Sequence, residues 1–154
     1  MTAETGGLRR MSLAMFGAGF ANFSILYCVQ PLLPAFAQSF GLGAAQASLA
    51  LSITTGIIAF GVLATSALSD AYGHRRLMIA SLIASALATL IAAAAPSWGW
   101  LVAARALIGV TMSAFLPAAM AYLAEETPPQ SVGMAVGLYI GGSAFGGMLA
   151  RMIA

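Results

Sequence analysis

The side chains that can carry charge in this sequence fall in short clusters between long apolar runs. Asp70 is followed closely by Arg75 and Arg76, whereas residues 11–69 and residues 77–104 hold no charged side chain at all. In a chain this apolar, such a cluster is stable only where water or lipid head groups solvate it. The cluster therefore predicts a turn at a membrane surface.

Arg105 is an isolated charge within an apolar segment. A charge inside a bilayer is costly unless it is paired or faces water. Two interpretations stay open: the side chain reaches back to the outer interface, or it lines an internal cavity. Gly109 and Ser113 share its face at helical spacing, so this face is a candidate path for a substrate.

Three further polar side chains interrupt the first apolar segment, namely Asn22, Tyr27 and Gln30. Polar groups within a bilayer need hydrogen-bond partners. Neighbouring helices can supply such partners, and so can a substrate. These residues are therefore candidate contacts of a transported molecule.

Other kinds of chemistry lack the residues they need. The sequence has no paired carboxylates within an apolar segment, no histidine cluster and no Gly-Lys phosphate motif, so we expect no catalytic residues, no metal and no cofactor. Ser143 follows a glycine, as in intramembrane proteases, but the single histidine, His74, lies in the charged turn. Cys28 is the single cysteine, and the absence of lysine leaves no basic face for nucleic acid.

The composition indicates an all-α integral membrane protein. Hydrophobic residues make up 61% of the chain and charged residues 6%, and the mean hydropathy is +0.96. Soluble domains carry roughly 25% charged residues. We expect one bundle over residues 1–154 with five transmembrane helices, at about 12–36, 46–68, 77–95, 100–124 and 131–154.

The arginines indicate the orientation. Arg9 and Arg10 precede the first predicted helix, and Arg75 and Arg76 follow the second, which places all four on the same side of the membrane. The positive-inside rule makes that side cytoplasmic. Arg151, near the end of the fifth helix, lies either near the outer interface or inside the protein.

The charged turn resembles the signature loop between the second and third helices of the major facilitator superfamily, broadly Gly-x-x-x-Asp-Arg-x-Gly-x-Arg-Arg/Lys. Asp70, Gly73, Arg75 and Arg76 match it, whereas Ser66 and Ala71 depart from it. Arg105 and Gly109 resemble the fourth-helix signature of the family. Residues 142–147 resemble its fifth-helix antiporter signature with Ser143 in place of proline, and residues 27–34 look like the first helix of bacterial sugar and drug exporters.

The resemblance implies a fold of two six-helix halves, of which this chain supplies an incomplete N-terminal half. It implies a multi-pass protein of the bacterial inner membrane that moves a sugar, drug or metabolite by alternating access, as proton-coupled efflux. Asp70, Gly73, Arg75 and Arg76 would form a conformational latch with Glu125 or Glu126, and Arg105 would take part in proton transfer or substrate contact. The missing helices or a partner chain would complete the protein. The alternative is a truncated remnant or scaffold that transports nothing.

Glycines recur at helical spacing in the fifth predicted helix. One stripe contains Gly133, Gly137 and Gly141, and a second pairs Gly142 with Gly146 and Ser143 with Gly147. Small residues at this spacing allow two helix backbones to approach closely. Both stripes are therefore predicted helix-packing surfaces.

Overall fold

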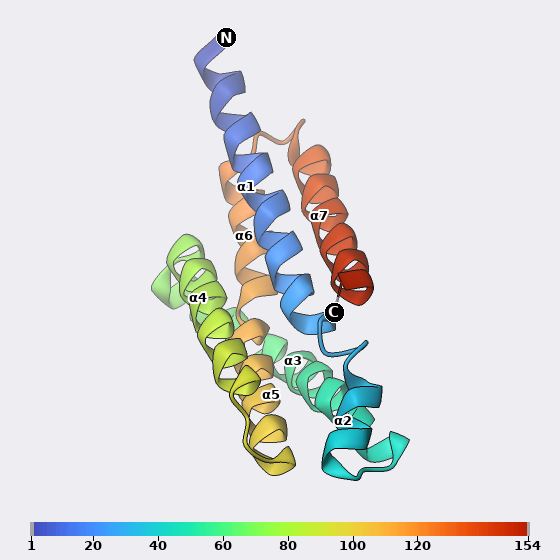
Figure 1. Ribbon diagram of the computed structural model, residues 1–154. Helices are drawn as coiled ribbons and strands as arrows, with labels where there is room; N and C mark the ends of the chain where they lie inside the picture. Colours follow the sequence, from blue (N-terminus) through green and yellow to red (C-terminus); the bar gives the residue numbers. More distant parts are fainter. Residues whose placement is uncertain (1, 154) are drawn as a thin grey trace.

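The computed structural model describes the backbone of residues 2–153 and the side chains of residues 7–65 and 71–153. This part of the chain is helical and contains no strand (Figure 1). The helices are α1 (Thr2–Tyr27), α2 (Leu33–Phe40), α3 (Ala44–Tyr72), α4 (His74–Ala93), α5 (Trp98–Ser113), α6 (Phe115–Glu126) and α7 (Val132–Ile153).

Long apolar helices confirm the predicted all-α membrane class. Within the described residues, four segments are long and apolar enough to cross a membrane, namely Ala44–Thr65, His74–Ala93, Trp98–Glu126 and Val132–Ile153. The first of the five predicted spans is divided between α1 and α2. Several helices also extend beyond the predicted ranges, because helical hydrogen bonding continues into polar residues that hydropathy does not mark.

The predicted helix over 12–36 ends early, at Tyr27. Pro31 has no N–H with which to bond the Tyr27 carbonyl four residues before it. The Gln30 N–H bonds that carbonyl instead, at 3.0 Å, in a tighter turn. Pro34 lies in the first turn of α2, where a missing N–H costs nothing. The prolines therefore place the end of α1 part of the way along the predicted span.

The predicted helix over 100–124 is also interrupted, at Ala114 between α5 and α6. Pro117 cannot donate to the carbonyl of Ser113. The hydroxyl of Thr65 in α3 donates to that carbonyl at 2.9 Å. The interruption is therefore satisfied by a neighbouring helix and not by water.

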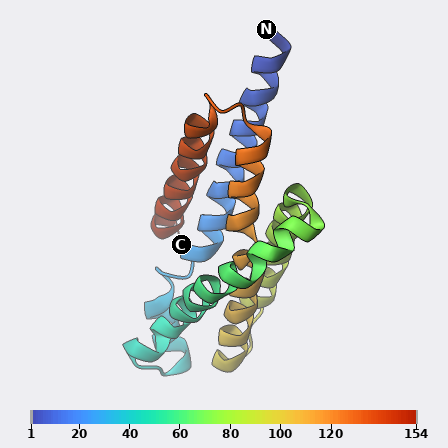
Figure 2. The same cartoon turned by 180° about the vertical axis from the view of Figure 1, so that it is seen from behind.

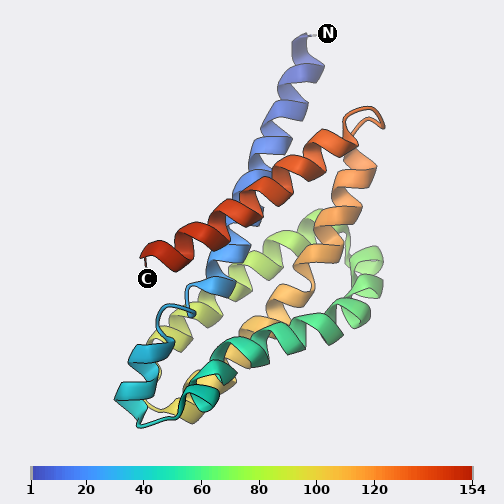
Figure 3. The same ribbon diagram turned by 90° about the vertical axis from the view of Figure 1, so that its right-hand side faces the viewer.

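Helices α1 and α7 lie side by side in all three views (Figures 1, 2 and 3). A Cβ atom added at Gly142 or Gly146 would overlap the carbonyl of Phe16 or Phe20, respectively. On the other helix, a Cβ at Gly19 would lie 2.7 Å from the Tyr139 carbonyl oxygen. Backbone therefore meets backbone along this contact.

The two predicted glycine stripes of α7 differ in their surroundings. Gly142, Gly146 and Gly147 are buried against α1, where a Cβ at Gly147 would lie 3.2 Å from the Tyr27 ring. A Cβ at Gly133, Gly137 or Gly141 would meet no described atom within 4 Å. These three glycines face away from the described helices. Of the two predicted packing stripes, only the second packs against a described helix in this structure.

Two apolar clusters form the interior. The first lies among α1, α4, α6 and α7 and includes Met15, Met78, Phe115, Leu123 and Tyr139. The second lies around α5 and includes Leu26, Leu101, Ile108 and Met112. Many large side chains stay exposed on the outside, Phe60 at 80% for example, as expected of a surface that faces lipid tails.

The glycine contact can be tested with two single-methyl substitutions. We expect Gly146→Ala to destabilise the protein by about 1–3 kcal/mol, because the new methyl group overlaps the Phe20 carbonyl. The control, Gly141→Ala, meets no atom and gains about 0.5–1 kcal/mol of helix propensity. Melting temperatures of the purified variants should therefore move in opposite directions. Equal melting temperatures would contradict the backbone contact.

Candidate functional site

Arg105 of α5 lies at the end of α1 and is 2% exposed. Its Nε donates to the Ala50 carbonyl at 2.9 Å. Its Nη2 donates to the Leu26 carbonyl at 3.0 Å, and its Nη1 to the Ile25 carbonyl at 3.3 Å. All three guanidinium nitrogens therefore bond backbone carbonyls, two of them in the last turn of α1.

The early end of α1 explains these bonds. The last carbonyls of a helix have no N–H partner in the following turn, and they carry the negative end of the helix dipole. Because α1 ends at Tyr27, the carbonyls of Ile25 and Leu26 belong to that last turn. Arg105 supplies both the donors and the positive charge. Among the described side chains no carboxylate pairs with Arg105.

Arg105 also borders a small cavity of about 160 Å³. Its other walls come from the α1–α2 connection, α2, α4 and α5, and include Cys28, Val29, Phe36 and Thr89. Of the two interpretations open for Arg105, the geometry shows the internal one, since the guanidinium points into the protein and not to the outer interface.

The rest of the Arg105 face is filled by α3. A Cβ at Gly109 would lie 2.9 Å from the Thr54 carbonyl oxygen, and the Thr54 hydroxyl donates to the Arg105 carbonyl at 2.9 Å. Ser113 is 1% exposed, and its Cβ would lie 2.6 Å from a Cβ at Gly61. Gly109 and Ser113 therefore pack against α3, and the predicted path along this face is closed in this structure.

Tyr27 and Gln30 meet at the opposite side of the α1 end, together with Arg151 of α7. The Arg151 Nε donates to Gln30 Oε1 at 2.6 Å. The guanidinium carbon lies 4.1 Å from the centre of the Tyr27 ring, a cation–π contact. Asn22, the third predicted contact, is 5% exposed inside the bundle, and its Oδ1 has no partner in the described part of the protein.

Arg151 is the residue whose position sequence reasoning left open. Its partners lie at the end of α1, and α2 continues past the C-terminal end of α7 in Figures 1 to 3. Arg151 therefore lies inside the protein's span and not at its outer edge. The two prolines after Gln30 were the signal in the sequence, because they stop α1 at the same level.

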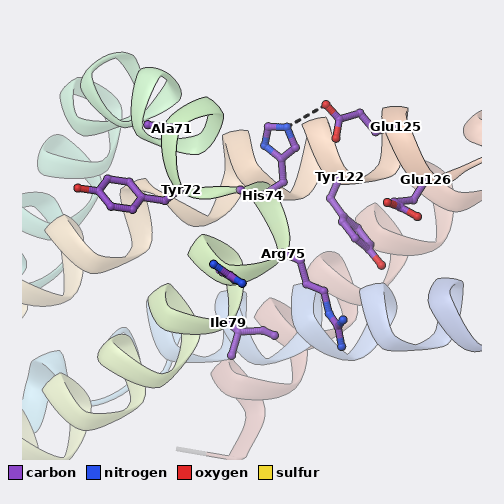
Figure 4. A pocket seen from close by; sticks show the side chains of 10 residues that line it. Ala71, Tyr72, His74, Arg75, Ile79, Tyr122, Glu125 and Glu126 are labelled. Atoms are coloured by element: carbon purple, nitrogen blue, oxygen red, sulfur yellow. Dashed lines mark hydrogen bonds and ion pairs between the residues drawn. The ribbon is translucent and has the colours of Figure 1, made fainter.

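The charged turn lies at the other end of the bundle, where α4 begins and α6 ends (Figure 4). His74 Nε2 lies 3.0 Å from Glu125 Oε1. The His74 side chain is 13% exposed. Its low exposure and the ion pair tie the first residue of α4 to the last turn of α6.

Among the described side chains, the predicted pairs of Arg75 and Arg76 with Glu125 or Glu126 are not formed. Arg75 and Arg76 are exposed. The side chain of Asp70 lies outside the described residues. Gly73 joins α3 to α4 with φ of 85°, a backbone angle that favours glycine. Five predicted latch residues, Gly73, Arg75, Arg76, Glu125 and Glu126, line one open cavity of about 760 Å³. His74 lines the same cavity and forms the ion pair with Glu125.

Comparison with known proteins agrees with the family resemblance of the sequence. The sequence profile of the Major Facilitator Superfamily matches residues 15–154. No solved structure matches the chain.

Three curated relatives are informative. The chain is 44% identical over 144 residues to the inner membrane transport protein YnfM of Escherichia coli, covering 94% of this chain and 34% of that protein. It is 39% identical over 115 residues to the puromycin resistance protein pur8 of Streptomyces alboniger, covering 71% and 23%. It is 30% identical over 131 residues to the multi-drug resistance efflux pump PmrA of Streptococcus pneumoniae, covering 82% and 32%.

The chain spans about a third of the length of the first relatives that it matches. The profile covers nearly all of its residues, and the relatives include transporters and an efflux pump, not enzymes. The chain therefore belongs to the major facilitator superfamily of membrane transporters.

Proposed function

We propose that this chain forms the N-terminal part of a secondary transporter that exports a small solute by alternating access. The observation that carries the proposal is the interrupted first helix, whose end lies between Arg105 and Arg151 and beside a cavity. Helices interrupted within the membrane mark substrate and ion sites in transporters. The names of the two resistance relatives support efflux as the direction.

The cellular location of the protein is proposed from a relative and from the positions of the arginines. One relative is named an inner membrane transport protein, and Arg9, Arg10, Arg75 and Arg76 gather at one side of the predicted topology. The proposal therefore places the protein in a bacterial inner membrane with a cytoplasmic N-terminus.

Protons are the proposed coupling ion. No acidic residue lies within the apolar part of any helix, and Asp70, Glu125 and Glu126 all belong to helix ends near the charged turn. A proton carried by this segment would therefore bind at the turn. His74 and Glu125, which form an ion pair, lie at this turn.

The ion pair is also the proposed latch. It joins α4 to α6 at the surface where the halves of a transporter separate and close, so its loss would change the balance between the two states. Arg75 and Arg76 stay available for partners beyond the described residues.

Transport itself is tested with the protein encoded by the complete gene, purified into liposomes under an imposed pH gradient. Puromycin, glucose, benzoate, citrate and glucose 6-phosphate serve as probes of three charge classes. We expect saturable flux of at least one probe above that of empty liposomes. Folded protein that moves none of them would contradict the proposal and favour a scaffold.

The role of Arg105 is tested with Arg105→Lys, which keeps the charge but cannot reach three carbonyls at once. Hydrogen bonds to charged groups contribute about 1.5–3 kcal/mol each. We expect a tenfold or greater loss of the flux found above, because the end of α1 loses its partners. A variant with normal flux would contradict the role.

The latch is tested with Glu125→Gln, which removes the charge that faces His74. Glu126→Gln is the matched control, since Glu126 has no ion pair among the described residues. We expect Glu125→Gln to change the flux at least threefold and to change the accessibility of a cysteine introduced at position 75 to a maleimide. If both glutamine variants behave alike, the ion pair is not the latch.

A further inference from the structure

The side of the α1 end that carries Arg151 differs from the side that carries Arg105. Arg105 is buried and each of its three nitrogens donates to a carbonyl. Arg151 is exposed, and among the described residues only its Nε has an acceptor. Its two Nη nitrogens therefore remain as free donors on a fixed guanidinium.

The guanidinium of Arg151 is held in place from two directions. The Tyr27 ring lies beneath it, with 4.1 Å between the ring centre and the guanidinium carbon, and Gln30 Oε1 accepts from Nε. Gly147, one turn before Arg151, leaves the space that the Tyr27 ring occupies. A planar guanidinium fixed in this way presents its two remaining nitrogens as a fork, which matches the two oxygens of a carboxylate or phosphate.

The depth of Arg151 excludes simple solvation at the outer interface. Helix α2, whose eight residues span about 12 Å, lies beyond the end of α1 and the C-terminal end of α7 (Figures 1 and 3). Trp98, an aromatic residue of the kind that anchors helices at a membrane interface, contacts Phe36 and Phe40 of that helix. Arg151 therefore lies well inside this boundary, where an exposed charge requires water or a charged partner.

The chain supplies no negative partner at this depth. Its four acidic residues are Glu4, Asp70, Glu125 and Glu126, and all four belong to helix ends at the other side of the bundle. The amide nitrogen of Gln30 has no acceptor in the described part of the chain and adds a donor next to the fork. The group that fits here is an anion.

We propose that Arg151, Gln30 and Tyr27 form the substrate-binding site for an organic anion, which binds through a carboxylate or phosphate group to the Nη nitrogens of Arg151. This assignment rests on the proposed transport function and names the substrate class. Tyr27 orients the guanidinium and offers its ring to an apolar part of the same molecule.

The test uses Arg151→Gln in the protein encoded by the complete gene, with Arg10→Gln as the control that removes one positive charge at the opposite end of α1. Benzoate, citrate and glucose 6-phosphate are the anionic probes, and glucose and puromycin are the neutral and cationic ones. We expect saturable flux of at least one anion, with a KM at least tenfold higher in Arg151→Gln and unchanged in Arg10→Gln.

A binding measurement separates this inference from the transport proposal. The melting temperature of the detergent-solubilised protein should rise with the recognised anion in the native protein and in Arg10→Gln, but not in Arg151→Gln. Such a rise without flux would support the site and contradict transport. Flux of glucose or puromycin alone, or an anion KM that Arg151→Gln leaves unchanged, would overturn the site and leave transport standing. If the protein shows neither flux nor a rise in melting temperature, both the anion site and the transport proposal are overturned.

A purely structural role of Arg151 predicts a different pattern. If the residue only joins α1 to α7, Arg151→Gln lowers the melting temperature without ligand and reduces the maximal rate for every probe, with no selective change in the KM for anions. The same pattern results if Arg151 pairs with a carboxylate from a further part of the protein. Either result would overturn the anion site.

Discussion

The structure depends on the end of a helix within an apolar layer. Pro31 stops α1 at Tyr27, and the last carbonyls of that helix then lie where water is scarce. Unbonded carbonyls in such a place are strongly destabilising. Arg105 satisfies them from α5, and its own charge is satisfied by the same carbonyls and by the Ala50 carbonyl of α3. One side chain thereby joins α1, α3 and α5.

Close packing follows from the same constraint. The guanidinium of Arg105 reaches α1 and α3 together only if α5 lies near α3, and Gly109 permits that approach next to the Thr54 carbonyl. On the other side, Gly142 and Gly146 bring α7 against α1, which carries Arg151 to the same helix end. Two arginines therefore flank the C-terminal end of α1. All three guanidinium nitrogens of Arg105 donate hydrogen bonds, whereas among the described residues only the Nε of Arg151 does so.

At the opposite end of the bundle, the described charged groups are solvated and not buried. His74 and Glu125 form their ion pair at the rim of an open cavity, where water can replace either partner at low cost. An exposed ion pair of this kind is easily broken. The hydrogen bonds of Arg105 are buried and are therefore difficult to break. The contrast suits the proposed transporter half, which would stay rigid around the end of α1 and change its contacts at the charged turn.

The sequence by itself determined the membrane class, the family resemblance and the stretches from which the helices form, because apolar run length and charge placement are local properties. Pro31 and Pro34 are the local feature of the sequence that accounts for the interruption near the end of the first helix. Hydropathy could not determine which glycine stripe packs, since Gly141 and Gly142 are neighbours and only the direction of α1 distinguishes them. It could not show that His74, and not an arginine, pairs with Glu125. The tertiary structure alone decided that all three guanidinium nitrogens of Arg105 donate to carbonyls, whereas the Nη nitrogens of Arg151 have no acceptor among the described residues. The partners of a charge within the bundle come from helices distant in the chain, which the sequence does not place.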